Sequence, residues 1–378
     1  MTFQATAVAI QTGNPIHIQG DPGVGKSALI NLLAKECEKH LETRIASLCD
    51  PTDFAGLPMN DGNGGVVYAA PRWAMNLTAH GGGLLFLDEI GGAPPTVQMG
   101  LMRVCLDKIV GDHELPKDDT WVVACSNPTD QTPGGFDFAP PLANRFCHLP
   151  WEFSPETWIT GMTSDFPIPS FPMLPDDWKS HIPESRAMVA SFAKARPEMI
   201  SSLPKEESLQ AGAWPSPRSW TVAAEMLAAV KSIDGKNDIL TELIAGCVGN
   251  GAGLEFVNFL NELDLPDPKE VLAAGKKYKL PKAGDKQFAI LNSATSYAIR
   301  SIECSYEAKD AIETWNQIWA VLEGAADQGA VDVAAGVCPN LVKCYENGME
   351  QGIDLPLVES AIEAFIPMLA KSGILKSN

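Results

Sequence analysis

The residues with the clearest chemical potential form a glycine-rich stretch near the N-terminus that ends in a lysine and a serine. The stretch follows the apolar segment 16–19 and matches the pattern G-x-x-x-x-G-K-S/T; its residues are Gly20, Asp21, Pro22, Gly23, Val24, Gly25, Lys26 and Ser27. In this pattern the glycines let backbone N–H groups curl around phosphate oxygens, and the following helix adds its positive end. Lys26 would reach the β- and γ-phosphates, and the Ser27 hydroxyl would bind Mg²⁺. We therefore predict that this loop, with Ala28 after it, binds ATP and Mg²⁺ and is no accidental glycine-rich turn.

Two carboxylates follow the apolar segment 84–87, which has the composition of a central parallel strand. Ligands in such sheets sit at the carboxyl ends of strands, where Asp88 and Glu89 would lie. Asp88 would hold Mg²⁺, directly or through water, and Glu89 would orient and polarise the attacking water as general base. A helix N-terminus with acidic residues in its first turn is the alternative interpretation.

The bulk composition restricts the class of protein. The chain has 378 residues, 45% hydrophobic content and a net charge of −19, which disfavours non-specific binding to nucleic acid. Nine scattered cysteines, with no C-x-x-C spacing, indicate free thiols in a reducing compartment. No stretch of about 18 apolar residues could span a bilayer, and the N-terminus lacks the features of a signal peptide. We expect a soluble, cytoplasmic protein without membrane insertion.

The elements around these residues predict an α/β domain followed by helices. Strands are expected at 16–19, 43–48, 84–87, 121–125 and 146–149, and later helices at 239–248, 287–304, 308–322, 331–345 and 357–371. The fold class is therefore α/β, with a five-stranded parallel sheet between helices, an all-helical lid and a helical C-terminal extension. The expected division is a nucleotide-binding domain at 1–155, a connecting region at 156–215, a lid at 216–300 and the extension at 301–378.

Taken in order, the motifs resemble those of the AAA+ superfamily, and specifically of the MoxR-type ATPases. Besides the phosphate loop and the Asp88–Glu89 pair, the resemblance includes a short insert at 50–58, the stretch Ile90 to Pro95, Cys125-Ser126-Asn127-Pro128, Leu142 to Phe146 and Ser216-Pro217-Arg218. Gly91 and Gly92 replace the usual Asn-Arg of the family. The resemblance covers roughly residues 10–230.

The resemblance implies roles for three further residues. Asn127 would bind the γ-phosphate or the attacking water, and Arg145 would act as an arginine finger in a neighbouring subunit's site. Arg218 would act as the second sensor, in its own subunit's site or a neighbour's. The plainer alternatives are a turn residue at Asn127, a surface ion pair at Arg145, and helix packing at Arg218.

Two predicted hairpins and six histidines are the remaining candidates for functional residues. Residues 59–67 and 108–121 are expected to form hairpins, which face the pore in related rings or are ordinary surface hairpins. Neither tip carries the aromatic or basic side chains that would grip a polymer strongly. The histidines are isolated in the sequence, without metal-ligand spacing, and are expected to be structural or exposed; they are His17, His40, His80, His113, His148 and His181.

The leading hypothesis is an ATPase ring, expected to be a hexamer, that remodels or activates a partner protein. The resemblance implies a partner with a von Willebrand factor A domain. A nucleic-acid motor is a second hypothesis, which the acidic charge and the hairpins disfavour. A nucleotide-dependent scaffold that scarcely hydrolyses ATP is the third, and the presence of Glu89 and Arg145 disfavours it.

Overall fold

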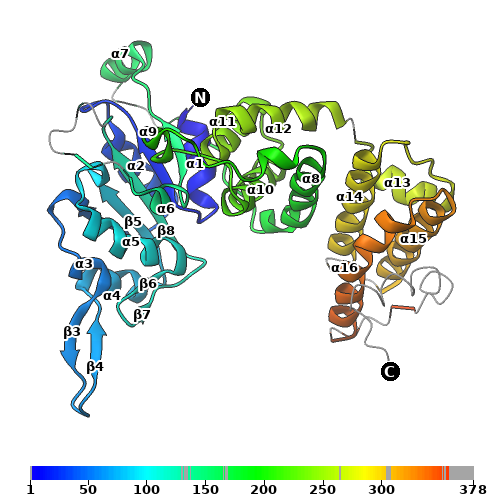
Figure 1. Ribbon diagram of the computed structural model, residues 1–378, viewed down its shortest axis with the longest axis horizontal. Coiled ribbons are helices and arrows are strands. Elements are labelled where there is room, and N and C mark those ends of the chain that lie inside the picture. Colours follow the sequence, from blue (N-terminus) through cyan, green and yellow to red (C-terminus); the bar gives the residue numbers. More distant parts are fainter. Residues whose placement is uncertain are drawn as a thin grey trace. The chain divides into compact units, whose positions relative to one another are not determined.

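The computed structural model describes residues 2–128, 131, 135–136, 138–164, 166, 169–263, 265–303, 308–350, 352 and 355–356 (Figure 1). The chain divides into two compact units. The first contains Met1–Trp178 and Glu198–Val257, and the second contains Lys179–Pro197 and Asn258–Asn378. The sequence-based boundaries at 155, 215 and 300 stay a prediction.

A five-stranded parallel sheet forms the centre of the first unit, in the order β2-β5-β8-β1-β9. Its strands are β1 (Ile16–Gln19), β2 (Leu41–Ile45), β5 (Gly83–Asp88), β8 (Thr120–Ser126) and β9 (Cys147–Pro150). The prediction of five strands is confirmed, but the second lies earlier than the predicted range 43–48. Residues Ala46–Leu48 form a 3₁₀ helix, because the buried Ala46 turns into the core where the strand ends.

Helices surround this sheet in the first unit. They are α1 (Thr2–Gln11), α2 (Lys26–Glu36), α3 (Thr52–Ala55), α4 (Arg72–Ala79), α5 (Pro95–Asp107), α6 (Pro140–Ala143), α7 (Pro155–Ser164), α9 (Glu207–Gln210), α10 (Pro217–Ser232) and α11 (Asn237–Val248). Inward residues of β5 and β8, among them Leu85 and Val122, pack in one buried cluster with α4, α5 and α6. Because strand residues alternate in direction, this cluster lies on one face of the sheet.

Two hairpins extend from the sheet domain, as the sequence predicted. The first pairs β3 (Leu57–Asn60) with β4 (Val66–Ala69), and the second pairs β6 (Ile109–Val110) with β7 (His113–Glu114). They are joined to each other: the Tyr68 amide donates to the Asp112 carboxylate over 2.8 Å, and the Asp112 amide donates to the Tyr68 carbonyl oxygen over 3.0 Å. The turn of the second hairpin is therefore bonded to the base of the first.

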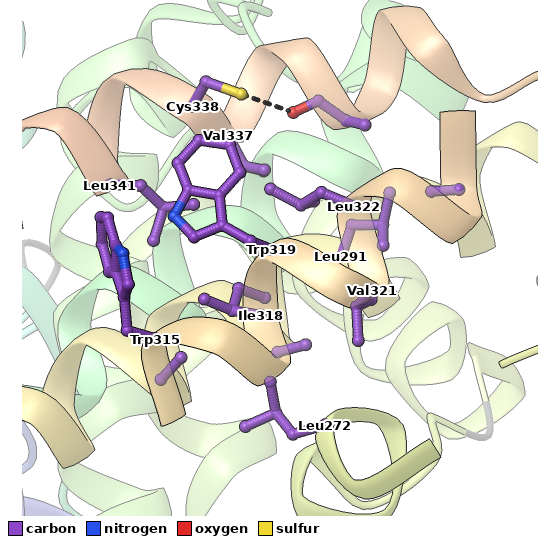
Figure 2. Close-up of a cluster of buried hydrophobic side chains, with 14 of the residues drawn as sticks. Leu272, Leu291, Trp315, Ile318, Trp319, Val321, Leu322, Val337, Cys338 and Leu341 are labelled. Carbon is purple, nitrogen blue, oxygen red and sulfur yellow. Dashed lines mark hydrogen bonds between the residues drawn. The ribbon is translucent and has the colours of Figure 1, made fainter. Parts of the chain in front are cut away.

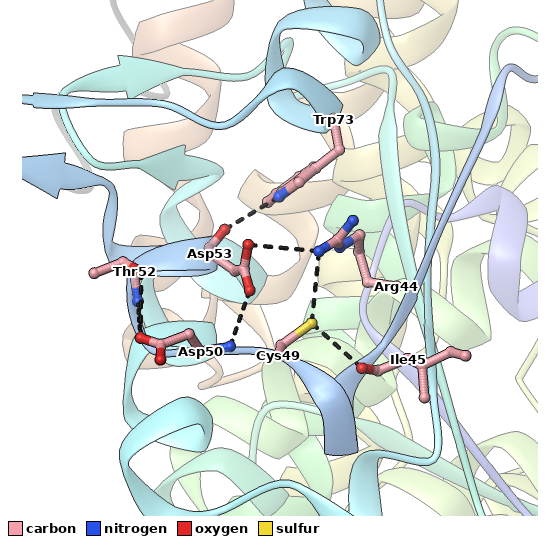
Figure 3. A network of polar contacts seen from close by, with 7 residues as sticks. All are labelled: Arg44, Ile45, Cys49, Asp50, Thr52, Asp53 and Trp73. Carbon is pink, nitrogen blue, oxygen red and sulfur yellow. Dashed lines mark hydrogen bonds and ion pairs between the residues drawn. The ribbon is translucent and has the colours of Figure 1, made fainter.

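A polar network fixes the segment that leads into the first hairpin (Figure 3). Asp53 accepts from the Arg44 guanidinium over 3.4 Å and from the Asp50 amide over 2.9 Å. The Trp73 indole donates to the Asp53 carbonyl oxygen over 3.1 Å. Arg44 ties the network to β2, so the short insert predicted at 50–58 begins from a rigid base.

The second unit is helical. It contains α8 (Ile182–Ala195), α13 (Pro268–Ala274), α14 (Gly284–Glu303), α15 (Ala308–Asp327) and α16 (Val331–Glu350); α12 (Asn250–Leu263) crosses the boundary between the units. Figure 2 shows its core, where Trp315 and Trp319 pack edge to face with ring centroids 5.6 Å apart, beside Leu291 and Leu341. The predicted helices at 287–304, 308–322 and 331–345 correspond to α14, α15 and α16. The predicted helix at 357–371 and Cys304 lie outside the described residues.

Two composition-based expectations can be compared with the described part of the chain. Its eight cysteines are all free thiols, six of them buried. None of its helices is long and apolar enough to cross a membrane.

Candidate active site

The loop between β1 and α2 owes its shape to glycines. Gly23 and Gly25 have φ angles of 79° and 92°, in the region that residues with a Cβ rarely adopt. Gly20 serves a different purpose, because a Cβ there would overlap with the carbonyl oxygen of Trp151. The Trp151 indole also donates to the Val24 carbonyl oxygen over 3.1 Å. The end of β9 thus supports the loop, a contact that the sequence pattern did not predict.

Lys26 lies inside this loop, and its side chain is largely buried. Its ammonium donates to the carbonyl oxygens of Gly20 and Asp21 over 2.7 and 2.8 Å, and to the Asn127 side-chain oxygen over 2.8 Å. Burial lowers the pKa of Lys26, and the nearby thiol of Cys125 and the carboxylate of Asp88 partly offset this effect. A phosphate group would supply the compensating negative charge that the buried ammonium lacks.

Ser27 and Asp88 converge beside the loop. The Ser27 hydroxyl donates to the Asp88 carboxylate over 2.9 Å, and the second carboxylate oxygen accepts from the Glu89 amide over 3.0 Å. A hydroxyl and a carboxylate oxygen are suitable ligands for Mg²⁺, which usually keeps several waters and binds substrate phosphates as well. The donor set therefore fits the predicted ion. The described part of the chain contains no cluster of three or more His, Cys, Asp or Glu side chains that could hold a metal ion.

Glu89 is exposed and follows β5 with a left-handed backbone, φ 53° and ψ 39°. Its carboxylate accepts from the Ser47 hydroxyl over 2.8 Å. Side chains at Gly92 and Gly91 would crowd the Cβ atoms of Ser47 and Ser126, at 2.9 and 3.3 Å. The two glycines that replace Asn-Arg therefore allow both serines to approach this turn. Ser47 was not among the candidate residues from the sequence. It lies in the 3₁₀ helix directly after β2, the strand that pairs with β5, and this position could have indicated that it lies near Glu89.

Arg145 and Arg218 form a second, separate set. Arg145 is half-buried between α6 and β9 and donates to the Pro141 carbonyl oxygen, while its buried Nε has no hydrogen-bond partner among the described residues. Burial lowers the pKa of Arg145, and the positive charge of Arg218 lowers it further. Within the described chain, neither arginine has a polar contact with Lys26 or with Asp88.

The two arginines are joined through their neighbours in the chain. The Ser216 hydroxyl, which caps α10, donates to the Asn144 side-chain oxygen over 2.6 Å. The Asn144 amide donates to the Trp214 carbonyl oxygen over 3.1 Å. Arg145 and Arg218 each lie one or two residues from this bridge, so the start of α10 is fixed to the end of α6.

The structure therefore separates the predicted site residues into two groups. Lys26, Ser27, Asp88, Glu89 and Asn127 lie together at the carboxyl ends of β1, β5 and β8. The two arginines lie together elsewhere in the same unit. Among the described residues, no carboxylate forms an ion pair with the Arg145 guanidinium within 4 Å, but the negative charge of Asp107 partly offsets the lowered pKa of this group. The arginine finger and the surface ion pair both stay predictions.

Comparison with known proteins gives limited similarity. No protein-family model matches the chain. Midasin of Giardia intestinalis is 27% identical over 154 residues, which are 38% of this chain and 3% of midasin. The crystal structure of a candidate ATPase from Cytophaga hutchinsonii has 18% sequence identity and a TM-score of 0.40, over 65% of this chain and 80% of that one. The chain thus corresponds to a small part of the curated relative.

The chain has an α/β fold with a five-stranded parallel sheet, followed by a helical part. Its parallel sheet order, the phosphate loop after β1 and the helical part that follows agree with the predicted fold class. The phosphate loop between β1 and α2 is the feature of this fold that indicates nucleotide binding.

Proposed function

We propose that the chain is a MoxR-like AAA+ ATPase that hydrolyses ATP in an oligomeric ring and thereby remodels or activates a partner protein. The observation that carries this proposal is the separation of the site residues into two groups. One group has residues suited to bind and cleave a nucleotide. The other has two arginines that form no ion pair within 4 Å among the described residues, and the negative charge of Asp107 only partly offsets the lowered pKa of Arg145. A ring of identical subunits supplies the arginines of one to the nucleotide of the next.

The first group can perform the chemistry of hydrolysis. Lys26 would exchange its carbonyl contacts for the β- and γ-phosphates, and Asn127, now held by Lys26, would turn to the γ-phosphate or the water. Glu89 would leave Ser47 and orient the attacking water. Mg²⁺, held by Ser27 and Asp88, would neutralise charge on the phosphate oxygens.

The second group would complete a neighbour's site. The Arg145 guanidinium has a buried Nε without a hydrogen-bond partner among the described residues and a like charge beside it, so a phosphate would stabilise it. An arginine finger contributes ~10³–10⁵ to the rate in comparable ATPases and GTPases. We propose that Arg145 is this finger and that Arg218 contacts the same phosphates in trans, from the same subunit.

The first hairpin is the proposed contact with a partner protein. Its strands expose Leu57, Met59, Val66 and Tyr68, the last with 47% of its surface accessible. These apolar side chains were not predicted from the sequence, where only the polar tip of the hairpin was considered. By the strand register, Leu57 and Met59 lie on one face of the hairpin and Val66 and Tyr68 on the other. Exposed apolar side chains on both faces favour a polypeptide partner. That the partner carries a von Willebrand factor A domain, and that the ring has six subunits, follow from the MoxR resemblance alone.

The nucleic-acid motor is the weaker alternative. The net charge is −19, and the tip of the first hairpin, residues 60–65, contains an aspartate and no lysine or arginine. A protein that follows a phosphate backbone needs basic side chains along its path. Stimulation of the ATPase by DNA or RNA would favour this alternative.

Mixed rings test the proposal. Lys26→Ala removes the phosphate contact of a subunit's own site, and Arg145→Ala removes the finger that it supplies. Each variant alone should lose hydrolysis, yet an equal mixture should recover about a quarter of the wild-type rate, because a quarter of the interfaces combine an intact site with an intact finger.

Two outcomes would overturn the proposal. If Arg145→Ala hydrolyses ATP at the wild-type rate, or the mixture recovers nothing while both variants assemble, the site is not shared between subunits. The rate per subunit should also rise with protein concentration, and a rate independent of concentration would indicate a monomeric nucleotide switch. Sedimentation of each variant with ATP provides the control for assembly.

A further inference from the structure

Three side chains from three adjacent strands form a buried hydrogen-bonded chain beside the candidate site. The Ser126 hydroxyl of β8 lies 2.8 Å from Nε2 of His17 on β1, and Nδ1 of His17 lies 3.0 Å from Nδ1 of His148 on β9. Nε2 of His148 lies 2.9 Å from the Ala143 carbonyl oxygen. The register of β1 with β9 places His17 directly beside His148, which their separation in the sequence concealed.

The last acceptor, the Ala143 carbonyl oxygen, fixes which atom donates and which accepts in each of the three hydrogen bonds. A carbonyl oxygen can only accept, so Nε2 of His148 carries the hydrogen. Burial lowers the pKa of His148 to about 4 and lowers that of His17 as well, so both rings are neutral at physiological pH. Nδ1 of His148 then accepts from Nδ1 of His17, and Nε2 of His17 accepts from the Ser126 hydroxyl.

The two ends of this chain reach the two groups of site residues. Ser126 directly precedes Asn127, and its carbonyl oxygen accepts from the amide of Gly20, the first residue of the phosphate loop, over 3.3 Å. Ala143 is the last residue of α6, two residues before Arg145. One hydrogen-bonded path therefore connects the residue that senses phosphate with the residue proposed to act on a neighbour's nucleotide.

An aromatic ring packs against the hydrogen-bonded side chains on one side, and a cavity next to them leaves room for their displacement. The Phe138 ring stands edge-on to His17, with ring centroids 4.7 Å apart, and excludes other hydrogen-bond partners from that side. Ser126, Asn127, His17 and His148 also line a cavity of about 930 Å³. Each imidazole nitrogen has one partner, so a displacement at one end must be transmitted or a buried polar atom must lose its partner.

We propose that Ser126, His17 and His148 form a positioning relay that couples Asn127 to Arg145, so that the nucleotide state of a subunit controls the finger it supplies to its neighbour. The inference rests on the proposed function, because it requires that Arg145 acts in trans. The three residues are proposed as positioning residues: each acts through Asn127 or through the segment that carries Arg145.

The first measurement compares relay variants with a matched control in the otherwise wild-type ring. His17→Leu should lower kcat about 10-fold and Ser126→Ala about 3-fold, with KM for ATP within twofold, because coupled contacts are lost while the phosphate loop stays intact. Thr120→Val is the control: Thr120 lies on the same strand as Ser126 and is buried, and its hydroxyl has no partner among the described residues. It should keep the wild-type kcat. If His17→Leu does not fold, as judged by circular dichroism, Ser126→Ala alone provides the test.

Mixed rings then distinguish a relay from a merely structural role. In a mixture of Glu89→Gln and Arg145→Ala subunits, the Glu89→Gln subunit should bind ATP and supply the finger, and the Arg145→Ala subunit holds the working site. In the finger-supplying subunit, His17→Leu should lower the recovered rate about 10-fold and Ser126→Ala about 3-fold. In the other subunit, either variant should lower the rate by less than twofold. Wild-type kcat in both relay variants, or an equal or larger loss when the variant is in the subunit with the working site, would overturn the relay and leave the proposed function standing. No recovered rate in the unmodified mixture would overturn both.

Discussion

The two groups of polar residues in the first unit differ in whether their hydrogen bonds are satisfied. At the phosphate loop, the Lys26 ammonium has three acceptors and the carboxylates of Asp88 and Glu89 have serine donors. At the end of α6, Arg145 has a buried Nε without a partner among the described residues and a second arginine nearby.

This difference indicates what each group requires. At the phosphate loop, oxygens of the chain itself accept from Lys26 and Ser27. Among the described residues, the arginine pair forms no ion pair within 4 Å, and the negative charge of Asp107 only partly offsets the lowered pKa of Arg145. An anion supplied from outside would therefore stabilise the arginine pair more.

Glu89→Gln should bind ATP and stall. The amide cannot polarise the attacking water, so kcat should fall ~10²–10⁴-fold while nucleotide affinity is kept. Binding of a fluorescent ATP analogue and release of phosphate would be measured on the same preparation. Glu114→Gln, which changes an exposed glutamate on β7, is the control and should hydrolyse at the wild-type rate. Equal rates for wild type and Glu89→Gln would show that the general base has been misassigned.

Arg218→Ala tests whether the second arginine belongs with the first. Loss of one charged phosphate contact should lower kcat ~10²-fold. Mixed with Lys26→Ala, it should recover about a quarter of the wild-type rate if it acts in trans. Recovery of no activity, with assembly intact, would place Arg218 in its own subunit's site and would separate its role from that of Arg145.

The pH dependence of stability tests the histidines between the two groups. Since the folded-state pKa of His148 is about 4 and the usual value is 6.5, the unfolded chain binds the proton first. The stabilisation is fully present above about pH 6.5 and is lost as pH falls towards 4, by up to roughly 3 kcal/mol. Urea unfolding of wild type and of His148→Leu across this range measures the difference. If the free energy of unfolding of wild type and of His148→Leu falls equally steeply between pH 6.5 and 4, His148 is not buried in its neutral form. His80→Gln changes an exposed histidine and is the control, which should behave as wild type.

Ser47→Ala should have the smallest effect, and in the opposite direction. Removal of the hydroxyl frees the Glu89 carboxylate, so the basal kcat should rise about fivefold, which corresponds to one hydrogen bond of moderate strength. In a Glu89→Gln background the same substitution should change nothing. A fall in kcat would indicate instead that Ser47 holds Glu89 in its productive position.

Local patterns predicted most of the fold and part of the site. The phosphate loop, the carboxylates after β5 and the two hairpins depend on neighbours in the sequence, so glycine spacing and apolar runs were sufficient to find them. The second strand was placed about two residues late, because Ala46 is buried by tertiary packing rather than by strand pairing. Helices α12 and α13 were missed.

The sequence by itself determined which groups could do chemistry: a lysine and a hydroxyl for phosphate and metal, two carboxylates, and two arginines in characteristic segments. Only the tertiary structure decided which of these groups meet. It placed Ser47 on Glu89, His17 on His148 and Arg145 beside Arg218, and among the described residues it gave neither arginine a polar contact with Lys26 or Asp88. The physical reason is that strands distant in the sequence pair side by side, so contacts across β2, β5, β8, β1 and β9 are set by the order and register of the sheet rather than by local spacing.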